Sequence, residues 1–212
     1  MMSPEELARW IFSMPKDFSE GKKFSYGNSG VSLMGRLIEA FEKMHLSDAF
    51  QKRICAPLRL KNTFLPVQGS RQNPGAKLEN YAYGFGVDDY FDPQGKHILK
   101  PSSDWTFSVA YASWGLISTV ADLGKFMRAL VQEKICKEVT LKKMFTPLLQ
   151  NYGWGINILT QNNATVFYHN GGFDGVSSTL RYYPEREMTL VILSSTRVTQ
   201  FAAKGWESKR KT

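Results

Sequence analysis

Two short polar segments of this 212-residue chain combine residue types that could move protons. Tyr26 and Asn28 stand two residues apart, and His169 is followed closely by Gly171 and Gly172. A phenol with a pKa near ~10 is a poor base at neutral pH and becomes useful only beside a cation. Taken alone, Tyr26 is typical of a loop or core tyrosine, and His169 of a strand histidine with a satisfied hydrogen bond. Any chemistry therefore requires a fold that brings the two segments together.

The composition is that of an ordinary globular protein and excludes several classes. Hydrophobic residues make up 42% of the chain and charged residues 22%, which excludes disordered, collagen-like and coiled-coil proteins. No apolar run approaches the ~18 residues that a membrane span needs. The first ten residues, MMSPEELARW, lack the basic and apolar regions of a signal peptide. We therefore expect no membrane span.

The charge and the cysteines favour neither nucleic acid nor metal as a ligand. The net charge is +8, but the basic residues are scattered or lie in the tail at 201–212, whereas a nucleic-acid binder gathers them on one element. A DNA-binding titration with a strong salt dependence would instead identify a basic nucleic-acid-binding protein. Cys55 and Cys136 are too few for a disulfide scaffold and lack metal-ligand spacing, so we expect free thiols and no metal or cofactor.

The elements that must position the polar segments begin with helices. Residues 1–146 are predicted to be mostly helical, interrupted at 61–113 by a long aromatic-rich excursion of short strands or turns. Ser3, Pro4 and Glu6 form a capping-box pattern, which predicts the start of the first helix. The periodicity, caps and prolines predict helices at 4–12, 29–44, from Ser47 to a stop at Pro57, 119–131 and 140–145.

After Pro147 the pattern changes to strands. Four β-rich runs are separated by short turns, which can join only antiparallel neighbours. The predicted strands are 152–159, 165–169, 176–183 and 188–194. Helices followed by an antiparallel meander over 147–200 indicate an α+β fold, and we expect the whole to form one domain that ends in the basic tail.

Four segments in order resemble the serine β-lactamase and penicillin-binding protein superfamily, in particular its class C β-lactamase, D-alanyl-D-alanine carboxypeptidase and esterase branch. Residues 24–30, FSYGNSG, resemble its Y-x-N element, and residues 54–64, ICAPLRLKNTF, its PLGM-x-NT segment. Residues 114–123, WGLISTVADL, are similar to its GGL-x-ST-x-x-DL segment, and 168–178, YHNGGFDGVSS, to its H-x-G segment. One such motif recurs by chance, but four in register are difficult to explain as an accident.

The resemblance implies roles for the polar residues. It implies a proton relay that includes Tyr26, with the cation beside the phenol supplied by a lysine near the nucleophilic serine. Asn28 would donate its amide to a substrate carbonyl, and His169 would stand where relatives often carry lysine. The N–H of Gly172 would be an oxyanion donor, and Gly171 and Gly172 would let substrate approach closely.

The family's nucleophile, the serine of an S-x-x-K motif at the start of a helix, has no good counterpart. Ser13 and Lys16 match the motif, but Pro15 stands in the turn that must be helical to bring them to one face. The second match begins at Ser208 in the basic tail. We therefore expect a β-lactamase-like domain that is incomplete on its N-terminal side and lacks its nucleophile.

Two functions remain open. The first is a serine hydrolase of the β-lactamase type, inactive alone, that transfers an acyl group from a β-lactam, a D-Ala peptide or an ester to water. The second is a non-catalytic binding or assembly module of the same fold. An incomplete domain would leave an unpaired sheet edge and an uncovered apolar face, so we expect self-association. The resemblance implies a periplasmic or extracellular protein, although the chain shows no export signal.

Overall fold

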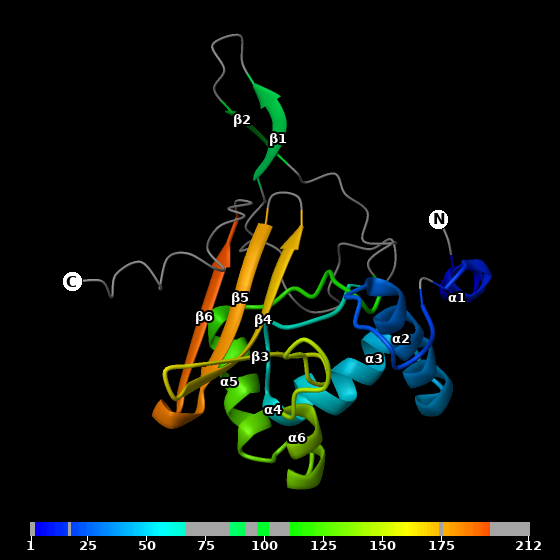
Figure 1. The fold of residues 1–212 in the computed structure, drawn as a ribbon. Coiled ribbons are helices and arrows are strands. Elements are labelled where there is room, and N and C mark those ends of the chain that lie inside the picture. The colour runs from blue at the N-terminus through cyan, green and yellow to red at the C-terminus, as the bar shows by residue number, and fades with distance from the viewer. Residues whose placement is uncertain are drawn as a thin grey trace.

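A four-stranded antiparallel sheet is the centre of the chain. The computed structural model describes residues 3–16, 18–66, 85–91, 97–101, 111–173 and 176–195. The sheet has the order β3-β4-β5-β6 and follows the chain as a simple meander (Figure 1). Its strands are β3 (Asn157–Gln161), β4 (Ala164–Phe173), β5 (Val176–Tyr183) and β6 (Met188–Ser194). The α+β prediction with an antiparallel meander is confirmed.

Two strand boundaries differ from the prediction. The first strand was expected from Tyr152, but the chain turns before β3, where the N–H of Gly153 donates to the carbonyl of Ile156 at 2.8 Å. Gly155 follows with φ +73°, a left-handed conformation that glycine adopts at little cost. The second strand was expected to end at His169. It continues to Phe173 because its last residues pair with β5, so the H-x-G segment is strand.

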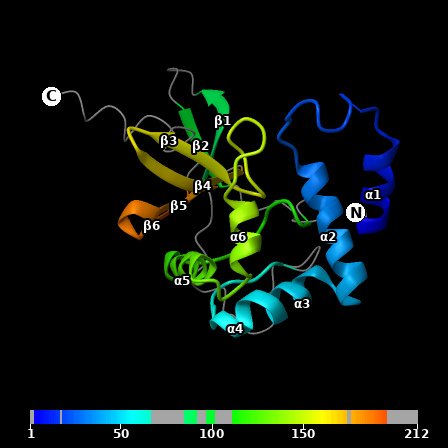
Figure 2. The same ribbon diagram turned by 60° about the horizontal axis from the view of Figure 1, so that its bottom comes forward.

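The first two helices lie where their signals predicted. α1 (Pro4–Ser13) begins with the predicted capping box, in which the hydroxyl of Ser3 accepts the N–H of Glu6 at 3.2 Å. The Glu6 carboxylate in turn accepts the N–H of Ser3 at 2.6 Å. α2 (Asn28–Glu42) lies between α1 and the remaining elements (Figure 2).

The third helical region is longer than predicted. It comprises α3 (Leu46–Phe50), the π-helical η1 (Gln51–Cys55) and α4 (Ala56–Leu58). The predictions that Ser47 caps this helix and that Pro57 ends it are wrong. His45 is the N-cap residue, and Pro57 lies in the first turn of α4, where a missing N–H costs little.

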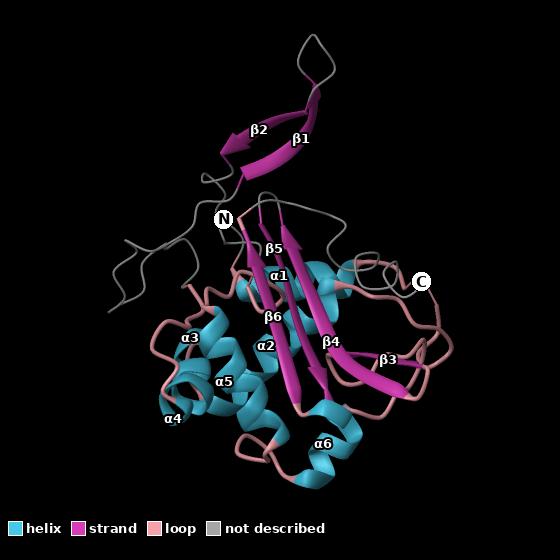
Figure 3. Cartoon of the chain, turned by 90° about the vertical axis from the view of Figure 1, so that its left-hand side faces the viewer, coloured by secondary structure: helices cyan, strands magenta, loops and turns pink. Residues whose placement is uncertain are grey.

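α5 (Val120–Val131) and α6 (Glu138–Met144) cover one face of the sheet (Figure 3). Met127 and Leu130 of α5 and Leu141 of α6 form a buried cluster, against which Leu180 and Tyr182 of β5 pack. Within the excursion, which was expected to hold short strands or turns, the structure describes an antiparallel pair of strands, β1 (Phe85–Phe91) and β2 (His97–Pro101). Within the excursion, residues 67–84, 92–96 and 102–110 fall outside the described residues, and so does the basic tail.

Asp122 joins two of the four family-like segments. Asp122 is only 1% exposed. Its carboxylate accepts the N–H of Asn62 at 2.8 Å and the hydroxyl of Thr63 at 3.0 Å. The hydroxyl of Thr119 caps α5 by accepting the N–H of Asp122 at 3.2 Å. Phe64 and Ile117 exchange two backbone hydrogen bonds of 3.0 Å beside it. The PLGM-x-NT-like and ST-x-x-DL-like segments therefore serve the framework.

Both cysteines are free thiols, as predicted. Cys55 is buried, and its thiol donates to the carbonyl of Thr63 at 3.3 Å. Burial, and to a lesser extent the charge of Asp122, raises the pKa of Cys55 to about 11. Since the thiolate is the reactive form, Cys55 is a packing residue rather than a nucleophile at neutral pH.

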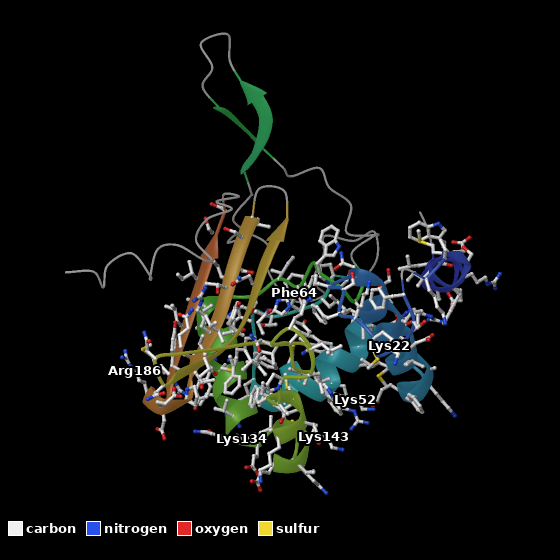
Figure 4. All side chains as sticks on the ribbon, viewed as in Figure 1. Lys22, Lys52, Phe64, Lys134, Lys143 and Arg186 are labelled. Carbon is white, nitrogen blue, oxygen red and sulfur yellow. The ribbon has the colours of Figure 1, made fainter. Side chains whose placement is uncertain are left out.

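Basic side chains lie on many different elements. Five of them come from the loop before α2, from η1, from the loop after α5, from α6 and from the β5–β6 turn. In that order they are Lys22, Lys52, Lys134, Lys143 and Arg186, which Figure 4 labels. Within the part of the chain that the structure describes, none of the helices has the length and apolarity to cross a bilayer.

The apolar face of α2 is not covered by the described residues. Val31, Met34, Leu37, Ile38 and Phe41 follow the predicted helical spacing, yet all are at least 42% exposed and Phe41 is 85% exposed. The buried positions of α2 are instead Ser32 and Gly35. Small residues face the interior because other chain segments approach the helix backbone closely there.

Gly35→Ala is expected to destabilise the protein. An added Cβ would lie 2.5 Å from the Cβ of Ala112 and 2.9 Å from Cε1 of Tyr111. The overpacking costs about 1–3 kcal/mol and exceeds the gain of about 1 kcal/mol in helix propensity. Gly124→Ala in α5 is the matched control, because a Cβ there meets none of the described atoms within 4 Å. Urea unfolding should show a lower midpoint for Gly35→Ala and an unchanged or higher one for Gly124→Ala; equal shifts would contradict the close approach.

Candidate active site

The structure brings Tyr26 and His169 together across 143 positions of sequence. The Tyr26 hydroxyl lies 3.4 Å from Nε2 of His169, and the ring centroids are 6.0 Å apart. The Tyr26 side chain is 59% exposed and His169 is half-buried. The pair is thus open to solvent on the side of the phenol.

Two different elements position these side chains. Tyr26 ends the loop before α2, directly ahead of the N-cap residue Gly27. His169 is on β4 opposite Leu180 of β5, and residues directly opposite in a sheet share a face. Because Leu180 packs against the α5–α6 cluster, His169 lies on the helix-covered face of the sheet.

The backbone selects one tautomer of neutral His169. Nδ1 lies 2.7 Å from the carbonyl oxygen of Asn170. A carbonyl oxygen only accepts hydrogen bonds, so Nδ1 must carry the proton. In the neutral ring Nε2 is then bare, and it can accept a proton or a hydrogen bond from the phenol of Tyr26.

Tyr152 is a third member of this group that the sequence analysis missed. Its hydroxyl lies 3.3 Å from Nε2 of His169, and its ring contacts Phe24 and Tyr26 at centroid distances of 5.1 and 6.0 Å. The sequence pattern predicted Tyr152 at the start of a strand. The glycines at 153 and 155 were a turn signal that could have moved it into a loop.

The remaining predicted site residues lie near the pair along the backbone. Asn28 is the exposed first residue of α2, two positions after Tyr26. Gly171 and Gly172 are exposed on β4, opposite Ser178 and Ser177. A Cβ at position 171 would lie 2.4 Å from the hydroxyl oxygen of Ser178, whereas at 172 the nearest atom is 3.9 Å away. A side chain at 171 would therefore require the Ser178 hydroxyl to turn away, whereas one at 172 would meet no described atom closer than 3.9 Å.

The other face of β4 carries a structural polar network. The hydroxyl of Thr179 donates to Oδ1 of Asn170 at 2.8 Å and accepts from Nε of Arg181 at 3.2 Å. The Arg181 guanidinium also lies over the ring of Tyr168, 5.2 Å from its centroid. The side chain of Asn170 is therefore engaged on the other face of the sheet, whereas its backbone carbonyl contacts His169.

The Ser13–Lys16 motif does not form a nucleophilic pair. The hydroxyl of Ser13 donates to the carbonyl of Trp10 at 2.7 Å, and Lys16 forms an exposed ion pair with Glu20. Ser13 is the last residue of α1, which lies on the far side of α2 from the sheet (Figures 1 and 2). Ser208 falls outside the described residues. Among the residues that are described, no three His, Cys, Asp or Glu side chains gather as metal ligands would.

The family model described as Beta-lactamase matches residues 1–212. The chain belongs to the beta-lactamase family. It is therefore related to the serine β-lactamases and penicillin-binding proteins, as the four segments implied.

Named relatives fit this assignment. Penicillin-binding protein 4* of Bacillus subtilis is 26% identical over 190 residues, which cover 84% of this chain and 41% of the relative. A beta-lactamase of Escherichia coli is 24% identical over 66% of this chain and 33% of its own length. The chain thus spans less than half the length of these curated relatives.

Solved structures share the fold. A D-stereospecific amidohydrolase from Streptomyces matches 92% of this chain and 57% of its own length, with a TM-score of 0.76 and 23% identity. An octameric penicillin-binding protein homologue from Pyrococcus abyssi matches 92% of this chain and 44% of its own length, with a TM-score of 0.73 and 22% identity. At this identity the likeness concerns the fold.

Proposed function

We propose that Tyr26 and His169 are the proton-transfer pair of a serine hydrolase that transfers an acyl group to water. The observation that carries this proposal is the 3.4 Å approach of the Tyr26 hydroxyl to the bare Nε2 of His169. As serine attacks the substrate carbonyl, the Tyr26 oxygen takes the serine proton and passes its own proton to Nε2. The imidazolium returns a proton through Tyr26 to the leaving group, and water repeats the cycle.

This relay avoids a free phenolate. A phenol alone is a weak base at neutral pH, but it can accept one proton while it donates another to an imidazole. The exposed position of Tyr26 suits contact with substrate. We propose that Asn28 donates its amide to the substrate carbonyl and that the N–H of Gly172 stabilises the oxyanion. Among the described residues, no atom lies closer than 3.9 Å to a Cβ built at position 172, which favours that role.

We propose a small acyl substrate: a β-lactam, a D-Ala peptide or an ester. Two solved structures with this fold are named a D-stereospecific amidohydrolase and a D-amino acid amidase. These names favour an amide of a D-amino acid within that set. Assignment to the class C and esterase branch rests on the sequence motifs alone.

The nucleophile in this proposal is an S-x-x-K serine supplied by a segment outside these 212 residues. The contacts of Ser13 with the carbonyl of Trp10 and of Lys16 with Glu20 support that view. The same contacts favour the second candidate function, a non-catalytic binding module. Hydrolysis of nitrocefin and nitrophenyl esters, with and without an S-x-x-K segment, separates the two. Mass-spectrometric mapping of a penicillin adduct to Ser13 would contradict both.

We also propose self-association through the edge of the sheet. β6 is the last strand of the sheet in the described part of the chain, and its Leu193 is 40% exposed. Open strand edges pair with other chains, and lysine on such an edge opposes pairing.

Leu193→Lys is therefore expected to lower the weight-average mass in sedimentation velocity toward that of a monomer. Val139→Lys is the matched control, since Val139 is an exposed apolar residue of α6 and the charge change is the same. Equal masses for the two variants would exclude the β6 edge as the contact.

A further inference from the structure

Nε2 of His169 faces two phenols rather than one. The hydroxyls of Tyr152 and Tyr26 lie 3.3 and 3.4 Å from it, both longer than an unshared bond of this kind. Nδ1 is engaged by the carbonyl of Asn170. A neutral imidazole therefore offers one lone pair to two donors, and each donor weakens the hold of the other.

The two phenols differ in how firmly they are held. Tyr152 is half-buried in the turn before β3. Its N–H donates to the carbonyl of Leu149 at 3.1 Å, and its own carbonyl accepts the N–H of Leu148 at 3.0 Å. Phe24 and Tyr26 pack on its ring. Burial, and secondarily Tyr26, raises the pKa of Tyr152 above its ordinary value. Tyr152 thus keeps its proton and is held within the protein. Tyr26, by contrast, is 59% exposed to solvent.

We propose that Tyr152 is a positioning residue that shares the Nε2 lone pair of His169 with Tyr26 and so leaves the Tyr26 hydroxyl loosely held and free to turn toward substrate. This inference rests on the proposed function, because it gives Tyr26 the exchangeable proton. Tyr152 holds the imidazole in place from the protein side. When Nε2 is protonated, the Tyr152 oxygen can accept its N–H.

The reactivity of His169 toward diethyl pyrocarbonate tests this arrangement in the chain as it exists. The reagent acylates a bare imidazole nitrogen, and peptide mass spectrometry separates His169 from the exposed His45. Tyr152→Phe removes the hydroxyl and keeps the ring contacts. We expect the His169 rate to rise roughly three- to tenfold, as the loss of one hydrogen bond implies. The His45 rate should stay constant.

Two further variants separate hydrogen bonding from general loosening. Tyr182→Phe alters another partly buried tyrosine, which packs in the α5–α6 cluster, and should leave the His169 rate unchanged. In the Tyr26→Phe/Tyr152→Phe double variant, the rate should exceed the product of the two single increases, because each phenol compensates for loss of the other.

Two outcomes would overturn the inference: an unchanged His169 rate in folded Tyr152→Phe, or strictly multiplicative effects in the double variant. Neither measurement requires catalytic turnover, so the proposed function would stand even if this inference failed. Conversely, an absence of hydrolysis in every form of the chain would remove the proposed function and leave the shared hydrogen bond standing.

Discussion

Tyr26→Phe is expected to lower kcat for nitrocefin or a short-chain ester by about 10²–10⁴ in a form of the protein that contains an S-x-x-K serine. In the 212-residue chain alone, the same substitution should leave a background rate unchanged. The phenol is needed only when a serine hydroxyl presents a proton to it. The experiment therefore compares Tyr26→Phe with and without the S-x-x-K segment, fused or added separately.

The size of this effect follows from the contact with His169. Phenylalanine keeps the ring packing against Tyr152 but removes the oxygen that lies 3.4 Å from Nε2. The serine proton then has no route to the imidazole, and catalysis falls to the contribution of binding and oxyanion donors. KM should change little, since the loss concerns the transition state.

Tyr168→Phe is the matched control for this prediction. Tyr168 is the neighbour of His169 on β4, but its ring lies under Arg181 on the opposite face of the sheet. Removal of the Tyr168 hydroxyl should leave kcat unchanged. If the 212-residue chain alone formed a stoichiometric acyl-enzyme that Tyr26→Phe abolished, the nucleophile would lie within these residues and the proposed external serine would be wrong.

Asp122→Ala is expected to cost about 3 kcal/mol of unfolding free energy. The substitution leaves the N–H of Asn62 and the hydroxyl of Thr63 without their carboxylate acceptor in a site that is 1% exposed. It also opens a cavity between the segment after α4 and the start of α5. For a chain of this size, whose total stability is about 5–15 kcal/mol, that is a large share.

Urea unfolding followed by circular dichroism measures this loss. Glu138→Ala is the control with the same change in charge, since Glu138 forms an exposed ion pair with Lys142 and should alter stability far less. Asp122→Asn keeps an acceptor oxygen and should fall between the two. Equal unfolding midpoints for Asp122→Ala and Glu138→Ala would show that Asp122 does not join the two segments.

Local signals in the sequence were sufficient for much of the framework. The capping box of Ser3 and Glu6 and the hydroxyl cap of Thr119 are interactions within one helical turn, so their residue types determine them. The meander is likewise determined locally, because short turns permit only antiparallel neighbours. The start of the third helical region was mispredicted because its N-cap residue, His45, makes no side-chain capping hydrogen bond. The inclusion of Pro57 was mispredicted because the π-helical segment η1, which precedes α4, has no local signature.

The interior face of α2 could not be predicted from periodicity. The apolar spacing of Val31, Met34 and Phe41 indicates a buried stripe, yet these side chains are exposed and Gly35 is buried. Periodicity reports which residues share a face, but it does not report what covers that face. Only the approach of Ala112 and Leu46 to the helix backbone decided it.

The sequence by itself determined the family, the α+β class and the candidates Tyr26 and His169, since these follow from residue types in a fixed order. The tertiary structure decided the grouping around Nε2. Tyr152 joins Tyr26 and His169 through a turn and a sheet register that set distances across 17 and 143 positions. Such distances depend on how separate elements pack, and no local pattern encodes them. The tautomer of His169 was decided in the same way, by the position of one backbone carbonyl.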